Sequence, residues 1–507
     1  MDIASASAVR AAERQLFESG AMDSLSLMDA VIERLHQAFR YGAPELAGLR
    51  PERVVVYAGK GNNAGDAVGL AARLGVPLVL RCACSPQELS PDTQAELERV
   101  EAPISVEMPL PSPRTLILDG LLGSGAVGAL REPYRALVEE LNALRAACPE
   151  SLCVALDIPT GLDSESGTAD VFSTVRADVT CPIGCVKPGM LADGAEQYVG
   201  RLLPIPLPEV ELPASSRWEL TGAFPASANA LGSWEWTGVA DAALLHGWLP
   251  RREQSCFKNR AGRVAVVAGS IGMLGAAQLC AEAALRVGAG LVCLYCLPEV
   301  YTLLAARVAP EVMVRPVSSY ADIEEPQAQA LLIGPGLGKI ASTEAEALSR
   351  LAESFAGTVV LDADGLNLAA ADHWALRPNW VLTPHPGEMR RLFPEAPAGR
   401  LETVRAYLGQ HDTVLLFKGA RTIIADRLRL CYNTTGGPYM ANGGQGDTLA
   451  GAIAGLAAQG LAPWYAATLG AWACGQAAAG AWAYQGFPPA IPASSVCRRL
   501  GRALSCL

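Results

Sequence analysis

Two segments of this 507-residue chain share one plan and constrain its fold more than any other feature. Residues 53–75 read RVVVYAGKGNNAGDAVGLAARLG, and residues 262–290 read GRVAVVAGSIGMLGAAQLCAEAALRVGAG. Each segment runs from a continuous apolar strand, through a glycine-rich turn, into an alanine-rich helix. Strands that are apolar on both faces are typical of parallel sheets covered by helices. Each segment therefore predicts the first strand and helix of its own α/β sheet.

Further strand and loop patterns follow both segments, which predicts two tandem α/β domains. RTLILDGLLG and LCVALDIPTG follow the first segment; ALLIGPGLG, TVVLDADGLN, WVLTPHPGE and TVLLFKGA follow the second. Between them, LPASSRWELTGAFPASANALGSWEWTG is rich in Pro, Ser, Ala and Gly and has no regular period. We predict domains at 1–212 and 239–507, with a linker at 213–238.

Composition narrows the class of protein. The net charge of −11 and the lack of Lys and Arg clusters argue against a nucleic-acid partner. The first twenty residues lack the apolar core of a signal peptide, so a cytoplasmic protein with free thiols is expected. From Thr448 to Cys497 no charged residue or His occurs, but Gly, Pro and Gln interrupt the stretch. It predicts closely packed buried helices rather than a membrane span.

The first glycine-rich turn suggests a nucleotide or polar ligand. Glycines 59 and 61 with Ala64 satisfy G-x-G-x-x-A, a loose dinucleotide fingerprint. One interpretation is an NADP-dependent oxidoreductase in which Arg81 contacts a 2′-phosphate. That fingerprint does not require the amides Asn62 and Asn63 or the carboxylate of Asp66. These groups either bind a polar ligand at the helix N-terminus or only close the turn and cap the helix.

Two further loops are expected beside this turn, because parallel strands end at one edge of the sheet. Asp119 ends one strand and is followed by Gly-Ser-Gly at 123–125; Asp157 ends the next and is followed by Thr160. Three polar loops in one domain indicate a site.

The order of these motifs resembles the epimerase domain of the NAD(P)H-hydrate repair enzymes. G-N-N-x-G-D, D-x-L-L-G-x-G, D-I-P-[ST]-G and ADVTCPIGCVKPG (177–189) follow one another over nearly the whole first half. The resemblance implies a Rossmann-like three-layer α/β/α domain that interconverts R- and S-NAD(P)H hydrate with a potassium ion. Asp157 would be the acid/base group. Potassium ligands would be Asn63, Asp119 and Thr160. Substrate contacts would be Asn62, Asn63, Ala64, Gly65, Asp66, Gly123, Ser124, Gly125, Ala126, Val127, Gly128, Ala129 and Asp157.

This half also departs from the family pattern. Ala64 and Ala67 stand where the family usually has Gly, Thr160 stands for Ser, and LMDA at 27–30 is a weakened motif. Thr160 keeps its hydroxyl. The two alanines are expected to narrow the site, which would affect the epimerase activity rather than the fold.

The second half carries G-x-G-D at Gly444, Gly446 and Asp447, before a helix of small residues. No Walker motif G-x-x-x-x-G-K-[ST] occurs, which excludes the P-loop class. Backbone N–H groups at such a turn can hold a phosphoryl group while the carboxylate accepts a hydroxyl proton. A kinase of a small alcohol is therefore one interpretation, and a capped helix start is another.

The segments around this turn resemble the dehydratase domain of the same repair enzymes. AGSIGMLGAA, LLIGPGLG, LDADGLN, LTPHPGEMRRL, LLFKGARTIIA and MANGGQGDTLAGAIAG occur in the family's order between about 265 and 460. The resemblance implies a ribokinase-like fold and a lyase that uses ADP, or ATP, with Mg²⁺ to dehydrate S-NAD(P)H hydrate. Asp447 would be the base. Ala276, Gly338, His385 and Asp447 would contact the hydrate; Lys418, Gly419, Ala420, Arg421, Thr422 and Gly446 would hold the nucleotide.

Some assignments in the second half stay open. Asp362, Asp364, Asn367 and Glu388 either serve magnesium or cap loops. SCFKNRAGR (255–263) keeps Lys258 but lacks the His of the family's H-K-G, and Gln445 replaces the commoner Thr.

We expect a bifunctional isomerase and lyase that forms a homo-oligomer, with no nucleic-acid or membrane partner. The alternative is a ribokinase-like small-molecule kinase with a non-catalytic, nucleotide-binding N-terminal module.

Overall fold

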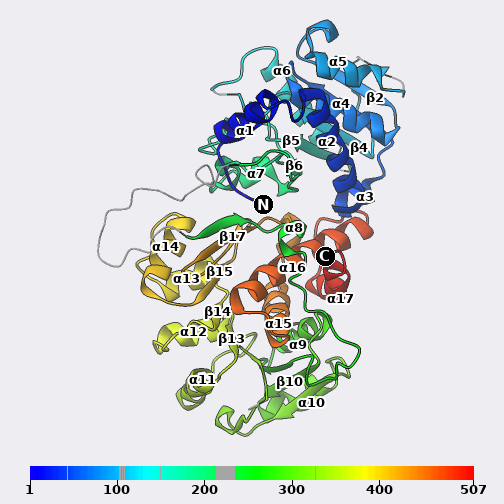
Figure 1. Ribbon diagram of the computed structural model, residues 1–507. Coiled ribbons are helices and arrows are strands. Elements are labelled where there is room, and N and C mark those ends of the chain that lie inside the picture. Colours follow the sequence, from blue (N-terminus) through cyan, green and yellow to red (C-terminus); the bar gives the residue numbers. More distant parts are fainter. Residues whose placement is uncertain are drawn as a thin grey trace. The chain divides into compact units, whose positions relative to one another are not determined.

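The computed structural model contains two compact units, each built on its own sheet (Figure 1). The structure describes residues 1–42, 44–101, 104–105, 107, 109–126, 128–148, 150–212, 234–325 and 327–507. One unit comprises residues 1–219 with 483–487, and the other comprises 220–482 with 488–507. The α/β class and the two tandem domains predicted from the sequence are confirmed.

The first unit has a parallel sheet in the order β3-β2-β1-β4-β5-β6-β7. Its strands are β1 (Arg53–Ala58), β2 (Leu78–Cys82), β3 (Ile104–Ser105), β4 (Thr115–Gly120), β5 (Leu152–Leu156), β6 (Val179–Cys181) and β7 (Arg201–Leu202). Its helices are α1 (Ala6–Glu18), α2 (Ser24–Gln37), α3 (Pro44–Leu49), α4 (Asn62–Leu74), α5 (Pro91–Glu98), α6 (Tyr134–Ala147) and α7 (Glu196–Val199), with a π-turn at Ala38–Gly42 and 3₁₀ turns at Pro86–Glu88 and Pro188–Leu191.

Helices cover both faces of this sheet. Alternate residues of β1, Val55 and Tyr57, form one buried cluster with Val138 and Leu141 of α6. On the other face α4 packs against β1 and β4 and is itself covered by α2 and α5. The three predicted layers follow from strands that are apolar on both sides.

The second unit has a mixed sheet in the order β11-β10-β9-β12-β13-β14-β15-β16-β17-β8, antiparallel only where β16 pairs with its two neighbours. Its strands are β8 (Trp236–Val239), β9 (Arg263–Val267), β10 (Leu291–Cys296), β11 (Val312–Pro316), β12 (Ala330–Ile333), β13 (Thr358–Leu361), β14 (Trp380–Leu382), β15 (Val414–Phe417), β16 (Thr422–Ala425) and β17 (Arg429–Asn433). Its helices are α8 (Ala242–Leu245), α9 (Leu274–Arg286), α10 (Pro298–Ala305), α11 (Ser342–Ser354), α12 (Asp364–Ala371), α13 (Pro386–Leu392), α14 (Arg400–Gln410), α15 (Gln445–Ala458), α16 (Pro463–Tyr484) and α17 (Ala493–Leu504), with 3₁₀ turns at Tyr320–Asp322 and Pro438–Met440.

The uncharged stretch from Thr448 to Cys497 forms buried helices, as predicted. α15 and α16 belong to the main core of the second unit, together with α9 and α17. Figure 1 shows these helices along one side of the sheet and α11 to α14 along the other. Among the described residues, none of the helices combines the length and apolar character that crossing a membrane requires. The cytoplasmic location stays a prediction.

Two other sequence predictions meet the structure here. All 14 cysteines are free thiols, as expected. Residues 213–233 of the predicted linker lie outside the described residues. The last three residues of that linker, 236–238, form the start of β8, which pairs in parallel with β17. The regular structure of the second unit therefore begins before residue 239.

Candidate active sites

Three polar loops of the first unit meet at one edge of its sheet. β1 and β5 flank β4 and run parallel to it, so the residues after Ala58, Gly120 and Leu156 lie side by side. Asn63 in the first turn of α4 bridges these loops, because its side-chain Nδ2 donates to the carbonyls of Leu122 and Leu156 at 3.2 Å each. The predicted convergence of the loops is thus seen directly.

Asp157 is the first residue after β5 and is fixed by donors on both carboxylate oxygens. Oδ2 accepts the backbone N–H of Ser124 at 2.8 Å, and Oδ1 accepts from Nζ of Lys187. Its φ of 62° is in the left-handed region, where non-glycine residues are uncommon and often functional. Burial raises the pKa of Asp157, but Lys187 and Ser124 outweigh it and hold this pKa below its usual range. The arrangement provides an ionised carboxylate in one orientation.

Asp119 and Thr160 form a buried pair beside Asn63. Asp119 accepts the N–H and the hydroxyl of Thr160, both at 2.8 Å, and the N–H of Leu121 at 3.2 Å. Burial raises the pKa of Asp119 to about 6, against the opposing hydrogen bonds from Thr160.

The oxygens of this group suit a hard monovalent cation. Asn63 Oδ1 is buried and accepts no hydrogen bond, while the Nδ2 of the same amide is occupied by two carbonyls. An orphaned buried carbonyl oxygen close to an anionic carboxylate is the kind of donor that such cations prefer. The residues Asn63, Asp119 and Thr160 therefore fit a potassium ion, whose presence stays a prediction.

The other predicted contacts in residues 62–66 differ in accessibility. Asn62 is exposed and donates to Ser24 Oγ at 3.2 Å, whereas Asp66 is 8% exposed. Burial, Asp157 and Glu13 together raise the pKa of Asp66 well above its usual value. Gly65 is packed against Met28, since a Cβ there would lie 2.6 Å from the Met28 sulfur.

The two alanines that were expected to narrow the site are both buried. Ala64 and Ala67 have no exposed surface. A Cβ on Gly120 of β4 would lie 2.8 Å from Ala67 Cβ and 3.3 Å from Ala64 Cα. The Ala67 methyl group therefore lies in the contact between α4 and β4, and Ala64 is buried beside it. This placement corrects the expectation that Ala67 narrows the site.

The loop 123–129 continues the site outward. Gly123 is beside Asp157, since a Cβ there would lie 3.4 Å from Asp157 Oδ2. Arg10 of α1 donates to the carbonyl of Ser124 at 3.3 Å. Gly125, Ala126, Gly128 and Ala129 are exposed, and Val127 lies outside the described residues.

Sequence reasoning assigned no role to Lys187 or Glu13. Lys187 is 1% exposed and binds Asp157, while Glu13 of α1 has its pKa raised by burial and by Asp157. The only signal for Lys187 was a single lysine inside the apolar run TCPIGCVKPG. Arg81, for which the sequence suggested contact with a 2′-phosphate, makes a bidentate ion pair with Glu140, with both hydrogen bonds at 2.8 Å. Its guanidinium group is therefore already paired with a carboxylate.

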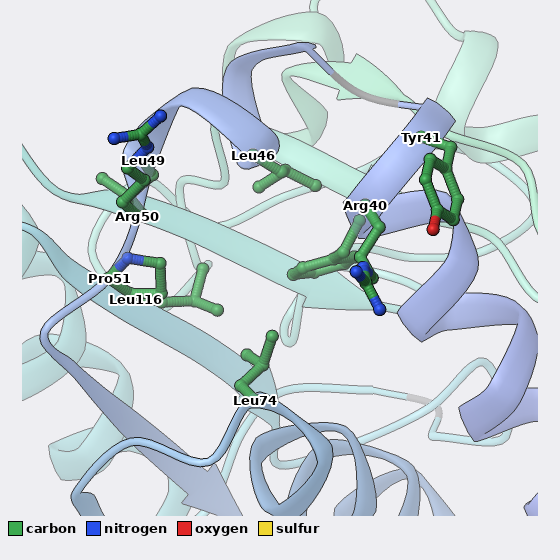
Figure 2. Close-up of a pocket in the computed structure, with 9 residues that line it drawn as sticks. Arg40, Tyr41, Leu46, Leu49, Arg50, Pro51, Leu74 and Leu116 are labelled. Carbon is green, nitrogen blue, oxygen red and sulfur yellow. The ribbon is translucent and has the colours of Figure 1, made fainter.

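A separate apolar cavity of about 330 Å³ lies in this unit, away from the polar loops. Figure 2 shows Leu46, Leu74 and Leu116 converging on it, with the guanidinium group of Arg50 turned away from them. Leu116 belongs to the start of β4, so the cavity is at the opposite end of the strands from Asp119. None of the predicted site residues lines it.

In the second unit Asp447 lies in the first turn of α15, beside an ion pair between the partly buried Lys418 and the buried Asp362. Lys418 Nζ donates to Asp362 Oδ1 at 2.6 Å, and Thr383 Oγ1 donates to the same oxygen at 2.8 Å. A Cβ on Gly446 would lie only 3.3 Å from Lys418 Nζ, so the lysine reaches the N-terminus of α15. Burial and Asp362 raise the pKa of Asp447 to about 6, and Lys418 opposes them.

His385 caps a helix as well as facing solvent. Its Nδ1 accepts the N–H groups of Gly387 at 2.9 Å and Glu388 at 3.3 Å, which satisfies the first turn of α13. The proton of the neutral ring then resides on Nε2, and the side chain is 52% exposed. In turn, the carboxylate of Glu388 accepts the backbone N–H of His385 at 2.8 Å, so one function of Glu388 is to cap the same helix.

Gly338 and Asp364 are also joined. Gly338 N–H donates to Asp364 Oδ2 at 2.8 Å, and Asn367 Nδ2 reaches Asp364 Oδ1 at 3.4 Å. Ala276 lies near the same loop, because a Cβ on Gly336 would be 3.0 Å from Ala276 Cβ. Asp364 thus supports the loop that carries Gly338. Of the two roles left open by the sequence, magnesium binding and loop capping, these contacts favour loop capping.

Hydrogen bonds from Arg400 hold the loop of residues 418–422, which is predicted to bind the nucleotide. The Arg400 guanidinium donates to the carbonyls of Phe417, Lys418 and Arg421, at 2.8 to 3.2 Å. Thr422 Oγ1 donates to the carbonyl of Gly419 at 2.9 Å. Ala420 and Gly419 are exposed, while Arg421 is buried.

Comparison with known proteins places the chain in a family. Residues 15–189 match the family described as YjeF-related protein N-terminus, and residues 264–499 match NAD(P)H-hydrate dehydratase. A bifunctional NAD(P)H-hydrate repair enzyme of Coxiella burnetii is 33% identical, over 89% of this chain and 89% of its own length. This chain belongs to the bifunctional NAD(P)H-hydrate repair enzymes.

Other members of the bifunctional repair enzymes show the same extent of similarity. The enzyme of Gloeobacter violaceus is 36% identical over 94% of this chain and 92% of its own, and that of Escherichia coli is 32% identical over 93% and 88%. Among solved structures, an ADP/ATP-dependent NAD(P)H-hydrate dehydratase of Bacillus subtilis, co-crystallised with ATP and Mg²⁺, is 29% identical. It covers 51% of this chain and 94% of its own, with a TM-score of 0.44.

Proposed function

We propose that residues 1–212 interconvert R- and S-NAD(P)H hydrate and that residues 239–507 dehydrate the S form with ADP or ATP. The observation that carries this proposal is a pair of matching sites. Each domain places a carboxylate, Asp157 or Asp447, at the end of its sheet where loops converge, next to a lysine that is ion-paired: Lys187 is buried and Lys418 is partly buried. The repair enzymes that resemble the chain along most of its length support the choice of substrate.

In the first domain Asp157 would exchange the proton of the hydroxyl on the hydrated ring carbon. Its carboxylate is ionised and held by Ser124, so it can accept that proton and return it after inversion. A potassium ion held by Asn63, Asp119 and Thr160 would supply a positive charge that balances Asp119 and fixes the three loops.

In the second domain Asp447 would take the proton of the same hydroxyl as a phosphoryl group is transferred to it. Backbone N–H groups at the start of α15, next to Gly446, are suited to hold that group, and Lys418 adds a positive charge beside them. Phosphate would then leave as the ring nitrogen donates electrons. Mg²⁺ would enter with the nucleotide and neutralise its phosphate charge.

The test uses the full chain and a purified mixture of R- and S-NADH hydrate. Recovery of NADH is followed by absorbance with ADP, ATP or neither, and with potassium or sodium. We expect complete recovery with nucleotide, at a rate above spontaneous epimerisation and dependent on potassium. If the enzyme converts only the S form, and the R form is consumed no faster than it epimerises spontaneously, the epimerase assignment is contradicted.

A small-alcohol kinase is the second candidate, because the same G-x-G-D turn serves kinases. Release of a stable phosphorylated product from an unrelated alcohol, without restoration of NADH, would move the second domain to that class. The homo-oligomer also stays a prediction, which sedimentation of the purified chain would test.

A further inference from the structure

Lys187 is buried at the edge of the first sheet that carries Asp157. It follows β6, the strand next to β5, and its side chain is 1% exposed. Nζ donates to Asp157 Oδ1 and to the carbonyl of Ile183 at 3.0 Å. Two of its three donors are therefore committed, one of them to the carboxylate assigned to the reaction.

Burial of an ammonium group is costly, which makes a purely structural role a poor explanation for this lysine. An apolar side chain of similar length would fill the same space without loss of hydration. Lys187 instead bonds to the carboxylate of Asp157, which also accepts the Ser124 N–H and whose backbone has a left-handed φ of 62°. The Ser124 hydrogen bond and the backbone conformation both fix the orientation of Asp157.

The surroundings of this pair are otherwise acidic. Burial disfavours the charged form of Lys187, but Asp157 outweighs it and raises the pKa of the lysine. The other titratable groups that interact with the pair are Glu13 on α1, Asp66 on α4 and Cys185 on the loop after β6. Without the lysine, Asp157 would share a buried region with two other carboxyl groups and no ammonium group bonded to it.

We propose that Lys187 is a positioning residue for the epimerase reaction, and that it holds the Asp157 carboxylate ionised and aimed at the substrate hydroxyl. This inference depends on the epimerase function proposed above. In the step that it serves, the substrate O–H bond breaks and its proton passes to Asp157, while the C–O bond becomes a double bond and the ring C–N bond breaks with its electron pair going to nitrogen. The nitrogen then re-forms the C–N bond on the other face of the carbonyl carbon, and the proton returns from Asp157 to oxygen. Lys187 keeps its own proton throughout.

The deciding experiment is the pH profile of R-to-S conversion by the full-length Lys187→Met variant, with the spontaneous rate subtracted. Loss of the ammonium raises the pKa of Asp157, so the acid limb of the profile moves to higher pH. We expect the midpoint of the acid limb to move up by at least about one pH unit, the smallest shift that a paired cation typically causes in a carboxylate. Nucleotide-dependent conversion of the S form reports on folding of the rest of the chain.

The matched control is Arg201→Met, which breaks another buried ion pair of the same domain. Arg201 Nη1 donates to both oxygens of Glu45, at 2.6 and 2.7 Å, and neither residue is among the groups that shift the pKa of Asp157. This variant loses comparable electrostatic stabilisation but should leave the acid limb in place.

Two further variants keep the test decisive if Lys187→Met does not fold. Lys187→Arg retains the charge, so it should keep the acid limb at the wild-type pH while kcat falls. The double variant Lys187→Met with Asp157→Asn removes both charges, and it should fold but lack epimerase activity.

Particular outcomes would overturn the inference. A Lys187→Met profile that coincides with the wild type would do so, as would an equal shift in Arg201→Met. Absence of epimerase activity in the wild type, in contrast, would show that the proposed function itself is wrong.

Discussion

Lys418 Nζ lies 2.6 Å from Asp362 Oδ1 and also reaches the N-terminus of α15, where Gly446 leaves it room. The ion pair thus connects the loop after β13 with the turn that carries Asp447. Asp362 raises the pKa of Asp447 and Lys418 lowers it, so the base sits between opposing charges. This relationship makes the acid/base behaviour of Asp447 open to experiment.

Replacement of Asp447 by Asn should nearly abolish nucleotide-dependent conversion of S-NADH hydrate. Asn keeps the size and polarity of Asp but cannot take the hydroxyl proton, a role typically worth about 10²–10⁴-fold in rate. Recovery of NADH with saturating nucleotide measures the loss. R-to-S conversion in the same variant serves as the folding control, because that site is on the other sheet. Full dehydratase activity would rule Asp447 out as the base.

The pH dependence of dehydration should show an acid limb near 6. Asp447 acts as a base only when ionised, and its pKa is raised to about 6, so kcat/KM should fall as the pH drops through that value. Asp362→Asn removes a charge that raises this pKa, and the limb should therefore move to lower pH. Lys418→Met removes a charge that lowers it, and the limb should move to higher pH.

These two profiles are compared with that of Lys258→Met, an exposed lysine of the same unit. The acid limb of the Lys258→Met profile should coincide with that of the wild-type protein. If Asp362→Asn and Lys418→Met shift the limb in the same direction, the opposing charges are not what sets the pKa of Asp447.

Asp119→Asn should raise the potassium concentration required for half-maximal epimerase activity. Asn keeps an acceptor for one of the two Thr160 donors, which bond different oxygens of Asp119, and it removes the buried negative charge that would face the cation. A loss of about 1.4 kcal/mol in cation binding corresponds to roughly tenfold in concentration. Titration of activity with potassium, at constant ionic strength, measures the effect. An unchanged potassium requirement would place the cation elsewhere or exclude it.

Most of the fold could be predicted from the sequence, because the buried parallel strands are continuous apolar runs that end in polar loops. Asp119 and Asp157 follow from their positions at strand ends, whereas Lys187 does not. A single lysine in an apolar run gives no sign of its partner, and the partner depends on β5 and β6 being neighbours. His385 likewise showed no sign that its Nδ1 caps α13.

The role of Ala67 was misjudged for a related reason. The glycine-rich turn fixes where α4 begins, but the sequence does not specify which residues of its first two turns face β4 and which face the open edge. That orientation depends on Gly120, a residue far along the chain whose missing side chain makes room for the alanine methyl.

Ala67→Gly tests this placement directly. If the methyl group fills the contact with β4, its removal should lower the stability of the first domain by about 1 kcal/mol, through helix propensity and lost packing. The epimerase rate should stay within about twofold of the wild type, a small change on the scale of free energies. Thermal unfolding and R-to-S conversion are measured on the same preparation. A marked rise in rate would mean that Ala67 does narrow the site.

The complementary change is Gly120→Ala, which adds a methyl group to the other side of the same contact. Its Cβ would lie 2.8 Å from Ala67 Cβ and 2.9 Å from the Asn63 carbonyl, so α4 must move away from β4. We expect a larger loss of stability than for Ala67→Gly, of about 1–3 kcal/mol, together with lower epimerase activity as Asn63 is displaced. Combining the two changes relieves the clash with Ala67 but not that with the Asn63 carbonyl. The double variant should therefore recover part of the stability, and a simple sum of the two losses would contradict direct contact across the interface.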